Sequence, residues 1–185
     1  MGHAAIAAPR MTVPPRVSPA MEDYLRAVYR LQDGVPVSTG ALAAELGVTG
    51  PSATNMVKRL ASLGYLHHVS HRGAELTAAG VHVALHVTRH HRLLELYLVR
   101  SLGYGWDEAH AEADRLEHHI SETLEAKLDA VLGHPATDPH GDPIPREDGS
   151  LEAACDVPLL DLAPGESATL RRVSDRNPDQ LRYLG

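Results

Sequence analysis

Imidazole and carboxylate side chains are concentrated in the middle of this chain, which holds 13 His among its 185 residues. Four of these side chains are spaced so that they fall on one face of an α-helix: His110, Asp114, Glu117 and His118. Residues at i, i+4, i+7 and i+8 span an arc of about 100° on a helix, so we expect the four to converge. His91 and Glu95 form another i, i+4 pair earlier in the chain. Two such stripes on neighbouring helices are how helical proteins build metal sites.

The types of ligand in these stripes narrow the chemistry. They include no thiolate or thioether, which favours Mn(II) or Fe(II), with Zn(II) as an adventitious occupant. The chain has no HExxH motif, and its single cysteine, Cys155, can form neither a thiolate zinc site nor an intramolecular disulfide. One cysteine also fits a reducing cytoplasm. A solvated acidic face is the alternative interpretation of the stripes, and a metal-dependent hydrolase that activates water is the alternative function from another class.

Helices are the elements that would position these residues. Apolar residues recur at helical spacing in five stretches, and Gly or Pro stands near the ends of several of them. Ser121 either continues the last stretch or caps a separate helix, and periodicity leaves both open. The predicted helices cover residues 21–31, 40–46, 51–63, 77–102 and 106–132.

A β-hairpin is predicted after the third helix. Residues 65–70 are strand-like, Gly73 marks a turn, and residues 74–76 return before Thr77 begins the next helix. Two helices joined by a turn at Gly47 make a helix-turn-helix, and the hairpin adds a wing. The N-terminal part therefore predicts a winged helix that binds double-stranded DNA.

The charge distribution agrees with a DNA-binding head on an acidic body. The net charge is −7, but residues 1–75 carry 7 Lys/Arg against 5 Asp/Glu, which is +2. Residues 76–133 carry 5 against 9 and residues 134–185 carry 5 against 10. Polar and basic side chains on the third helix and the wing are the candidates for contact with DNA. They are Thr49, Ser52, Thr54, Asn55, Lys58, Arg59 and Arg72.

Several motifs together carry a resemblance to a known family. They are MEDYLRAVYRL at 21–31, GVTGPSATNMVKRL at 47–60, HRLLE at 91–95, HAEADRLEHHIS at 110–121 and GDPIP at 141–145. In this order they resemble the diphtheria toxin repressor family of iron- and manganese-dependent transcriptional regulators. The resemblance implies a cytoplasmic homodimer that is not an enzyme and that binds a palindromic operator at metal-uptake genes, with Mn(II) as corepressor. It also implies that Pro51 joins the candidates for contact with DNA, because this position touches bases in the family. A metal-independent winged-helix regulator is a third hypothesis.

The resemblance also assigns metal ligands. The principal site would comprise Asp23, Asp114, Glu117 and His118, and the second site His91, Glu95 and His110. Asp23 and Asp114 stand where iron-type members have Met and Cys, so the manganese type is expected and the iron type is the alternative. Gln180 aligns with a further ligand of the second site. Arg26 stands where manganese-type members have Glu, which leaves the number of metal ions open.

The expected fold is mainly α, and the expected domains follow from these elements. They are a flexible arm at 1–19, a winged-helix domain at 20–76, a helical metal-binding and dimerisation domain at 77–145, and a linker with the truncated start of an SH3-like β-domain at 146–185. Proline and glycine predict a linker at 134–158, and 168–173 is predicted to be a strand. His82, His86 and His90 form a further helical stripe, which we interpret as surface. No membrane-spanning segment is expected.

Overall fold

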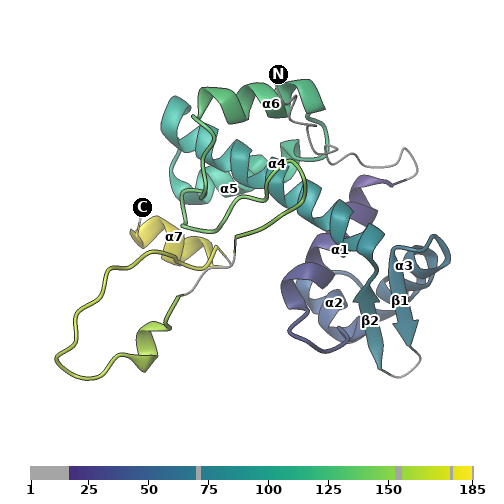
Figure 1. Ribbon diagram of the computed structural model, residues 1–185. Coiled ribbons are helices and arrows are strands. Elements are labelled where there is room, and N and C mark those ends of the chain that lie inside the picture. The colour runs from purple at the N-terminus through teal and green to yellow at the C-terminus, as the bar shows by residue number, and fades with distance from the viewer. Residues whose placement is uncertain (1–16, 70–71, 153–155, 176, 185) are drawn as a thin grey trace, which may run out of the picture. The chain divides into compact units, whose positions relative to one another are not determined.

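The structure, a computed structural model, describes residues 17–69, 72–152, 156–175 and 177–184. It is mainly α-helical, as predicted (Figure 1). Most of the predicted flexible arm lies outside the described residues, as do His71 and Cys155. Within the described part of the chain, no helix combines the length and apolar character needed to span a bilayer. The elements in order are α1 (Pro19–Leu31), α2 (Thr39–Glu45), α3 (Gly50–Ser62), β1 (Leu66–Val69), β2 (Gly73–Leu76), α4 (Ala78–Leu102), α5 (Trp106–Leu116), α6 (Glu122–Val131), a 3-10 turn (Leu159–Asp161) and α7 (Pro178–Leu184).

The chain divides into two compact units. The first runs to Thr88 and includes Glu147–Gly149, and the second comprises Arg89–Arg146 and the chain from Ser150 onward. Helices α2 and α3 of the first unit begin at capped positions: Ser38 accepts a hydrogen bond from the Ala41 amide, and Thr49 from the Ser52 amide. Apolar residues of α1, α2, α3 and the hairpin form one core beneath these helices.

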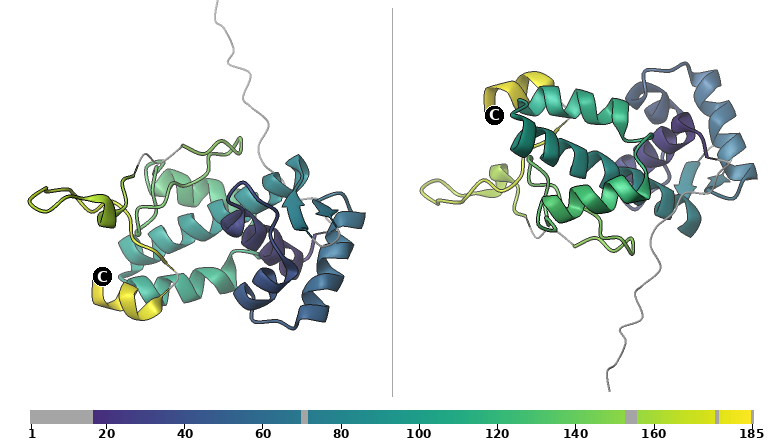
Figure 2. Two further views of the ribbon diagram at one scale, coloured as in Figure 1. Left: turned by 90° about the horizontal axis from the view of Figure 1, so that it is seen from below. Right: turned by 90° about the horizontal axis from the view of Figure 1, so that it is seen from above.

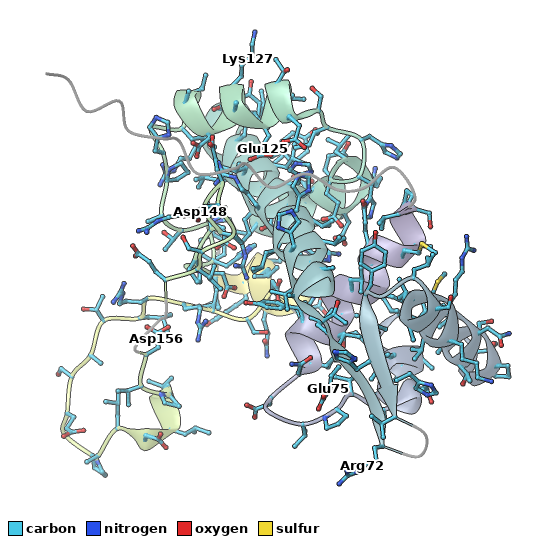
Figure 3. All side chains as sticks on the ribbon, turned by 45° about the vertical axis from the view of Figure 1, so that its right-hand side comes forward. Arg72, Glu75, Glu125, Lys127, Asp148 and Asp156 are labelled. Atoms are coloured by element: carbon cyan, nitrogen blue, oxygen red, sulfur yellow. The ribbon has the colours of Figure 1, made fainter. Side chains whose placement is uncertain are left out.

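The predicted wing is present as an antiparallel pair, β1 and β2, with Leu66 opposite Leu76 (Figure 1). Val37 adds a short bridge to Ala74, so the chain before α2 also joins this sheet. Gly73 has a φ of 115°, and a Cβ at this position would lie 2.5 Å from the Val37 carbonyl oxygen. Glycine is therefore required where the hairpin meets this third segment. Arg72 projects from the tip of the hairpin (Figure 3).

The second unit is built around the C-terminal half of α4. Leu94 and Leu98 of α4 pack with Ala109 and Ala113 of α5 and with Leu128 of α6. The open question about Ser121 is settled, because its side chain accepts a hydrogen bond from the Leu124 amide and caps α6 as a separate helix. The predicted helix 106–132 is therefore two helices.

The prediction of a linker from residue 134 is wrong for its first part. Asp138, Ile144 and Pro145 are buried, and Ile144 packs in a core cluster with leucines of α4. The backbone carbonyls of Pro143 and Pro145 accept hydrogen bonds from Arg92 and Arg89 of α4. Pro and Gly indicate only that a segment is irregular, and here arginine side chains hold an irregular segment against a helix.

The predicted strand at 168–173 is also wrong, since the described part of 146–185 contains no β-strand. A strand needs a ladder of backbone hydrogen bonds with a neighbouring edge. Here the Val173 amide donates to the His140 carbonyl, but no strand ladder forms among the described residues of this segment. The segment ends instead in α7, which lies beside α5 in both views of Figure 2. Leu181 of α7 is 1% exposed, so its side chain anchors this helix.

Candidate metal centre and nucleic-acid interface

Three of the predicted ligands meet where α4 faces α5. His91 Nε2 lies 3.0 Å from Glu95 Oε1, and His110 Nδ1 lies 2.7 Å from the same oxygen. The two ring nitrogens are 3.2 Å apart. Ligand atoms about 2.1 Å from a divalent ion are themselves separated by about 3 Å, so these three atoms have the spacing of a coordination shell. Both His91 and Glu95 are buried.

Asp114 and Glu117 adjoin this group through His91. His91 Nδ1 lies 2.7 Å from Glu117 Oε2 and 3.4 Å from Asp114 Oδ1. His118 Nε2 lies 3.3 Å from Glu117 Oε1. Helix α5 ends at Leu116, so Glu117 is its C-cap and His118 already belongs to the following turn. Within this unit, Asp114, Glu117 and His118 of the predicted principal site therefore adjoin the predicted second site, with His91 between them.

Asp23 and Gln180 lie on other elements. Asp23 is a half-buried residue of α1, in the first unit. Gln180 is exposed on α7, where its backbone amide donates to the Asn177 side chain. The assignment of both residues to metal sites stays a prediction.

Two buried residues that sequence analysis did not select complete the group. Asp138 and His140 are 6% and 2% exposed, and both can present a ligand atom within 4.8 Å of one on Glu95. Glu95 thus directs one oxygen to His91 and His110 and the other toward His140, whose Nδ1 is 3.8 Å away. The signal in the sequence was an aspartate and a histidine two residues apart within a proline-rich stretch, which resembled a linker.

Burial and neighbouring charges shift the pKa values of Glu95, Asp138 and His140. Burial raises the pKa of Glu95, but the charge of His91 and hydrogen bonds from His110 and His91 outweigh it, so the net pKa is well below the usual range. Burial, followed by the negative charge of Glu95, raises the pKa of Asp138 to about 7. Burial lowers the pKa of His140, which keeps the ring neutral and able to act as a ligand.

A divalent ion fits this donor set. Neither ring nitrogen of His140 has a hydrogen-bond partner in the described part of the chain, although both are buried. A buried imidazole without hydrogen bonds is costly unless another group, such as a metal ion, engages it. Glu95, Asp114 and Glu117 also place three carboxylates around His91, and a divalent ion would offset their negative charge. We conclude that this region of the second unit can hold at least one divalent ion.

The interpretation of the histidine stripe on α4 as surface is wrong. His86 and His90 are 5% and 4% exposed, and His82 is half-buried. The reason is that α4 is buried without interruption along residues 83–91. His90 in addition makes hydrogen bonds to Glu117 and Glu125.

The predicted DNA-binding residues form the outer face of α3 and the tip of the wing. All of them except Thr54 are exposed, while the other face of α3 buries Ala53, Val57 and Leu60. Thr54 is half-buried, and its hydroxyl donates to the Gly50 carbonyl. The exposed set is Thr49, Pro51, Ser52, Asn55, Lys58, Arg59 and Arg72.

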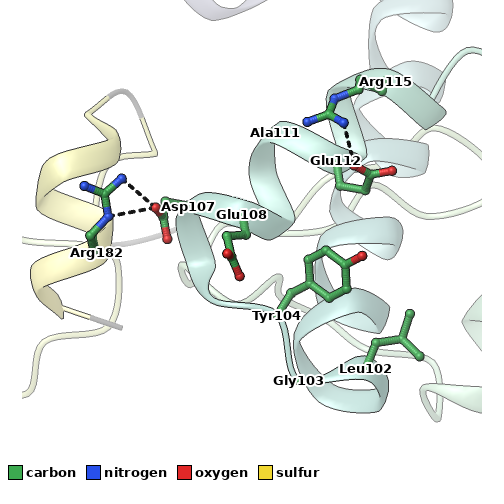
Figure 4. A pocket seen from close by; sticks show the side chains of 9 residues that line it. All are labelled: Leu102, Gly103, Tyr104, Asp107, Glu108, Ala111, Glu112, Arg115 and Arg182. Carbon is green, nitrogen blue, oxygen red and sulfur yellow. Dashed lines mark hydrogen bonds and ion pairs between the residues drawn. The ribbon is translucent and has the colours of Figure 1, made fainter.

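A pocket of about 730 Å³ lies elsewhere in the second unit (Figure 4). Arg182 of α7 lines it and binds Asp107 of α5, with Nε and NH2 at 3.0 and 2.9 Å from one carboxylate oxygen. The residues that line the pocket include none of the predicted metal ligands. It therefore gives no support to the hydrolase alternative, which needs a substrate pocket at the metal.

Comparison with known proteins decides the family. A family model described as "Iron dependent repressor, N-terminal DNA binding domain" matches residues 16–74, and one described as "Iron dependent repressor, metal binding and dimerisation domain" matches residues 77–146. The diphtheria toxin repressor of Corynebacterium jeikeium (strain K411) is 34% identical over 164 residues, which cover 86% of this chain and 68% of that protein. The chain belongs to the diphtheria toxin repressor family. The resemblance stated from the motifs is confirmed.

Other members of the diphtheria toxin repressor family differ in the metal that their names give. The iron-dependent repressor IdeR of Mycobacterium leprae (strain TN) is 40% identical over 149 residues, which cover 80% of this chain and 60% of that protein. A solved structure described as a manganese-dependent transcriptional repressor in complex with manganese is 41% identical, with a TM-score of 0.82, and the match covers 89% of this chain and 76% of that one. The chain thus spans less than two thirds of the mycobacterial relative.

Proposed function

We propose that this chain is a metal-dependent transcriptional repressor that uses Mn(II) as corepressor. The observation that carries the proposal is the buried group of imidazoles and carboxylates between α4, α5 and the 138–142 loop. A group of this kind needs a cation, and it lies in the same chain as an exposed recognition helix. Family membership favours this function over the hydrolase alternative.

The choice of Mn(II) rests on the ligand atoms. Glu95, Asp114 and Glu117 supply hard carboxylate oxygens, and the histidines supply nitrogen, with no sulfur ligand among them. Hard oxygen ligands favour Mn(II) over softer ions, although the general order of affinities lets other divalent ions compete in vitro. Fe(II) is the alternative within the family.

The proposed ligands of the ion are the candidates in the second unit together with Asp23 of α1. They are Asp23, His91, Glu95, His110, Asp114, Glu117, His118, Asp138 and His140, in one or two metal positions. Bound there, a divalent ion would supply the charge that lets these carboxylates lie together and would join Asp23 of α1 to Glu117 and His118. Burial of His91 and Glu95 keeps water away from the ligand atoms that they present.

The DNA side of the proposal uses the exposed face of α3. Asn55 can read adenine through two hydrogen bonds, and Lys58 and Arg72 can contact phosphates. A cytoplasmic homodimer on a palindromic operator would place two such helices in major grooves one helical turn apart, about 34 to 36 Å. Promoters of metal-uptake genes are the proposed targets.

A selection experiment tests the whole proposal. A pool of randomised DNA duplexes is incubated with the chain and Mn(II), with Fe(II) under anaerobic conditions, or with a chelator, and the bound duplexes are sequenced. We expect a palindromic sequence to be enriched with Mn(II) and to bind at least about tenfold more weakly in chelator. Equal affinity for the enriched duplex with and without metal would contradict corepression, and a larger response to Fe(II) would contradict the choice of Mn(II).

A further inference from the structure

A buried cluster of four charged side chains lies behind the metal-binding residues of the second unit. Arg89 and His90 of α4 face Glu125 and Asp129 of α6, and each is at most 8% exposed. Arg89 donates from Nε to Glu125 at 2.5 Å, from NH1 to the Pro145 carbonyl at 2.8 Å, and its NH2 lies 3.4 Å from Asp129.

His90 connects this cluster to Glu117. Its Nδ1 lies 2.9 Å from the Glu117 carbonyl oxygen, and its Nε2 lies 3.1 Å from Glu125 Oε2. A carbonyl oxygen only accepts hydrogen bonds, so Nδ1 is the donor. Burial alone would raise the pKa of Glu125, but hydrogen bonds with His90 and Arg89 outweigh it and lower the pKa to about 2. The Glu117 carbonyl and the Glu125 carboxylate therefore each contact a different ring nitrogen of His90.

Glu117 is held at two atoms by consecutive histidines. It is the C-cap of α5, and a carbonyl at the end of a helix has no donor from its own helix. His90 donates to this carbonyl, while His91 Nδ1 lies 2.7 Å from the Glu117 carboxylate. The Glu117 side chain is fully buried, so its direction depends on where its backbone is fixed.

We propose that His90 is a positioning residue for metal binding, which orients Glu117 through a hydrogen bond to its backbone carbonyl and is not itself a ligand. The inference rests on the proposed function, because this orientation affects metal affinity only if Glu117 is a ligand. Partners of this outer kind typically change metal affinity by roughly 10- to 100-fold when they are removed.

Two substitutions of His90 each remove one of its two hydrogen bonds and keep the other. His90→Asn leaves an amide donor near the position of Nδ1 and removes the donor at Nε2, whereas His90→Gln does the reverse. Mn(II) affinity of the full chain is measured without DNA, from the electron paramagnetic resonance signal of free Mn(II). We expect His90→Asn to stay within about threefold of the wild type and His90→Gln to bind roughly 10- to 100-fold more weakly.

Asp129→Asn is the matched control, because it alters the far end of the same cluster without touching Glu117. It should leave Mn(II) affinity within about threefold of the wild type, while urea unfolding of the metal-free variants reports any general loss of stability. The proposal is overturned if His90→Gln binds Mn(II) as tightly as His90→Asn, or if Asp129→Asn loses as much affinity as His90→Gln. A wild-type chain that binds no Mn(II) would instead contradict the proposed function.

A second measurement needs no variant and decides the matter if one of them fails to fold. In the metal-free wild-type chain with ¹⁵N-labelled histidine, nuclear magnetic resonance reports which ring nitrogens of His90 carry a proton. The proposal requires a protonated Nδ1. A His90 ring that is protonated at Nε2 alone would overturn it.

Discussion

Helices α3 and α4 both carry polar residues, but these residues have opposite surroundings. Asn55 and Lys58 of α3 are exposed, whereas His90, His91 and Glu95 of α4 are buried and contact other side chains of the second unit. An exposed polar side chain of α3 can be substituted without leaving a buried hydrogen-bond partner unsatisfied. The polar groups of α4 are interdependent, because each one satisfies another. The exposed polar residues of α3 are thus independent of one another, whereas the buried polar residues of α4 form a network.

The largest expected effect comes from a buried ligand of that network. Glu117→Gln keeps the size of the side chain but removes its charge, so we expect Mn(II)-stimulated DNA binding to fall by at least about 100-fold. DNA binding in chelator should be unchanged, because the DNA-binding residues are untouched. Fluorescence anisotropy of a labelled operator duplex measures both affinities.

Glu112→Gln is the control for this prediction. Glu112 lies on α5, is half-buried and forms an ion pair with Arg115. Glu112→Gln should leave stimulation by Mn(II) intact. If the two substitutions behaved alike, the contrast between Glu117 in the buried network and a carboxylate outside it would lose its functional meaning.

A second prediction concerns the cost of burying a carboxylate. Burial raises the pKa of Asp138 from 3.8 to about 7, so the fold favours the protonated form. The stability contributed by this protonation is fully present below pH 3.8 and is lost as the pH rises through about 7. The metal-free chain should therefore be less stable at about pH 8 than at about pH 5, by up to about 3 kcal/mol from this group.

Asp138→Asn isolates that contribution in urea unfolding with a chelator present. The amide keeps an oxygen that can accept from the His140 and Asp142 amides, as Asp138 Oδ1 does. We expect the variant to lose much of the difference between the two pH values. If the pH dependence is unchanged, ionisation of Asp138 costs the folded chain little stability.

The independent residues of α3 should give smaller and separable effects. Asn55→Ala should weaken binding to the selected operator by about 1–3 kcal/mol and relax the sequence preference at one base pair. Lys58→Ala should weaken binding to all duplexes alike and reduce the salt dependence by about one phosphate contact. Binding measured over a range of salt concentrations, with operator and unrelated duplexes, distinguishes the two. Non-additive losses in the double variant would contradict the independence of these residues.

The smallest effect is expected from an exposed ion pair that belongs to neither the proposed metal site nor the proposed DNA-binding face. Arg182 binds Asp107 at the protein surface, where ion pairs contribute little. Arg182→Ala should leave the affinities for Mn(II) and DNA unchanged and lower the melting temperature only slightly. Leu181→Ala, which removes the buried anchor of α7, should lower it more. The reverse order in thermal melts would show that charge, not apolar burial, holds α7.

Most of the first unit could be predicted because its signals are local. Ser38 and Thr49 cap α2 and α3, and Gly73 lies where the hairpin turns. Each of these residues acts on the backbone within a few positions of itself. The apolar spacing of α3 also separated its inner face from its outer one. The exposed DNA-binding surface follows directly from that separation.

The metal-binding network could be predicted only in part. Spacing on α4 and α5 selected His91, Glu95 and His110, and the structure brings these together. Spacing could not select His140, because a loop has no periodicity that places one residue opposite another. The pattern was also misleading for His90, since an i, i+4 stripe of histidines is the same whether water or another helix covers it.

The sequence by itself determined most of the helices, the hairpin, the family and the chemical type of the candidate ligands, because caps, apolar periodicity and residue identity are local properties. Tertiary structure decided which polar groups lie within hydrogen-bond distance of one another. His91 meets Glu117 across 26 residues of chain, and His90 meets Glu125 across 35. Contacts over such separations depend on how whole helices pack, and the packing is set by apolar cores such as the one at Leu94, not by the spacing of the polar residues themselves.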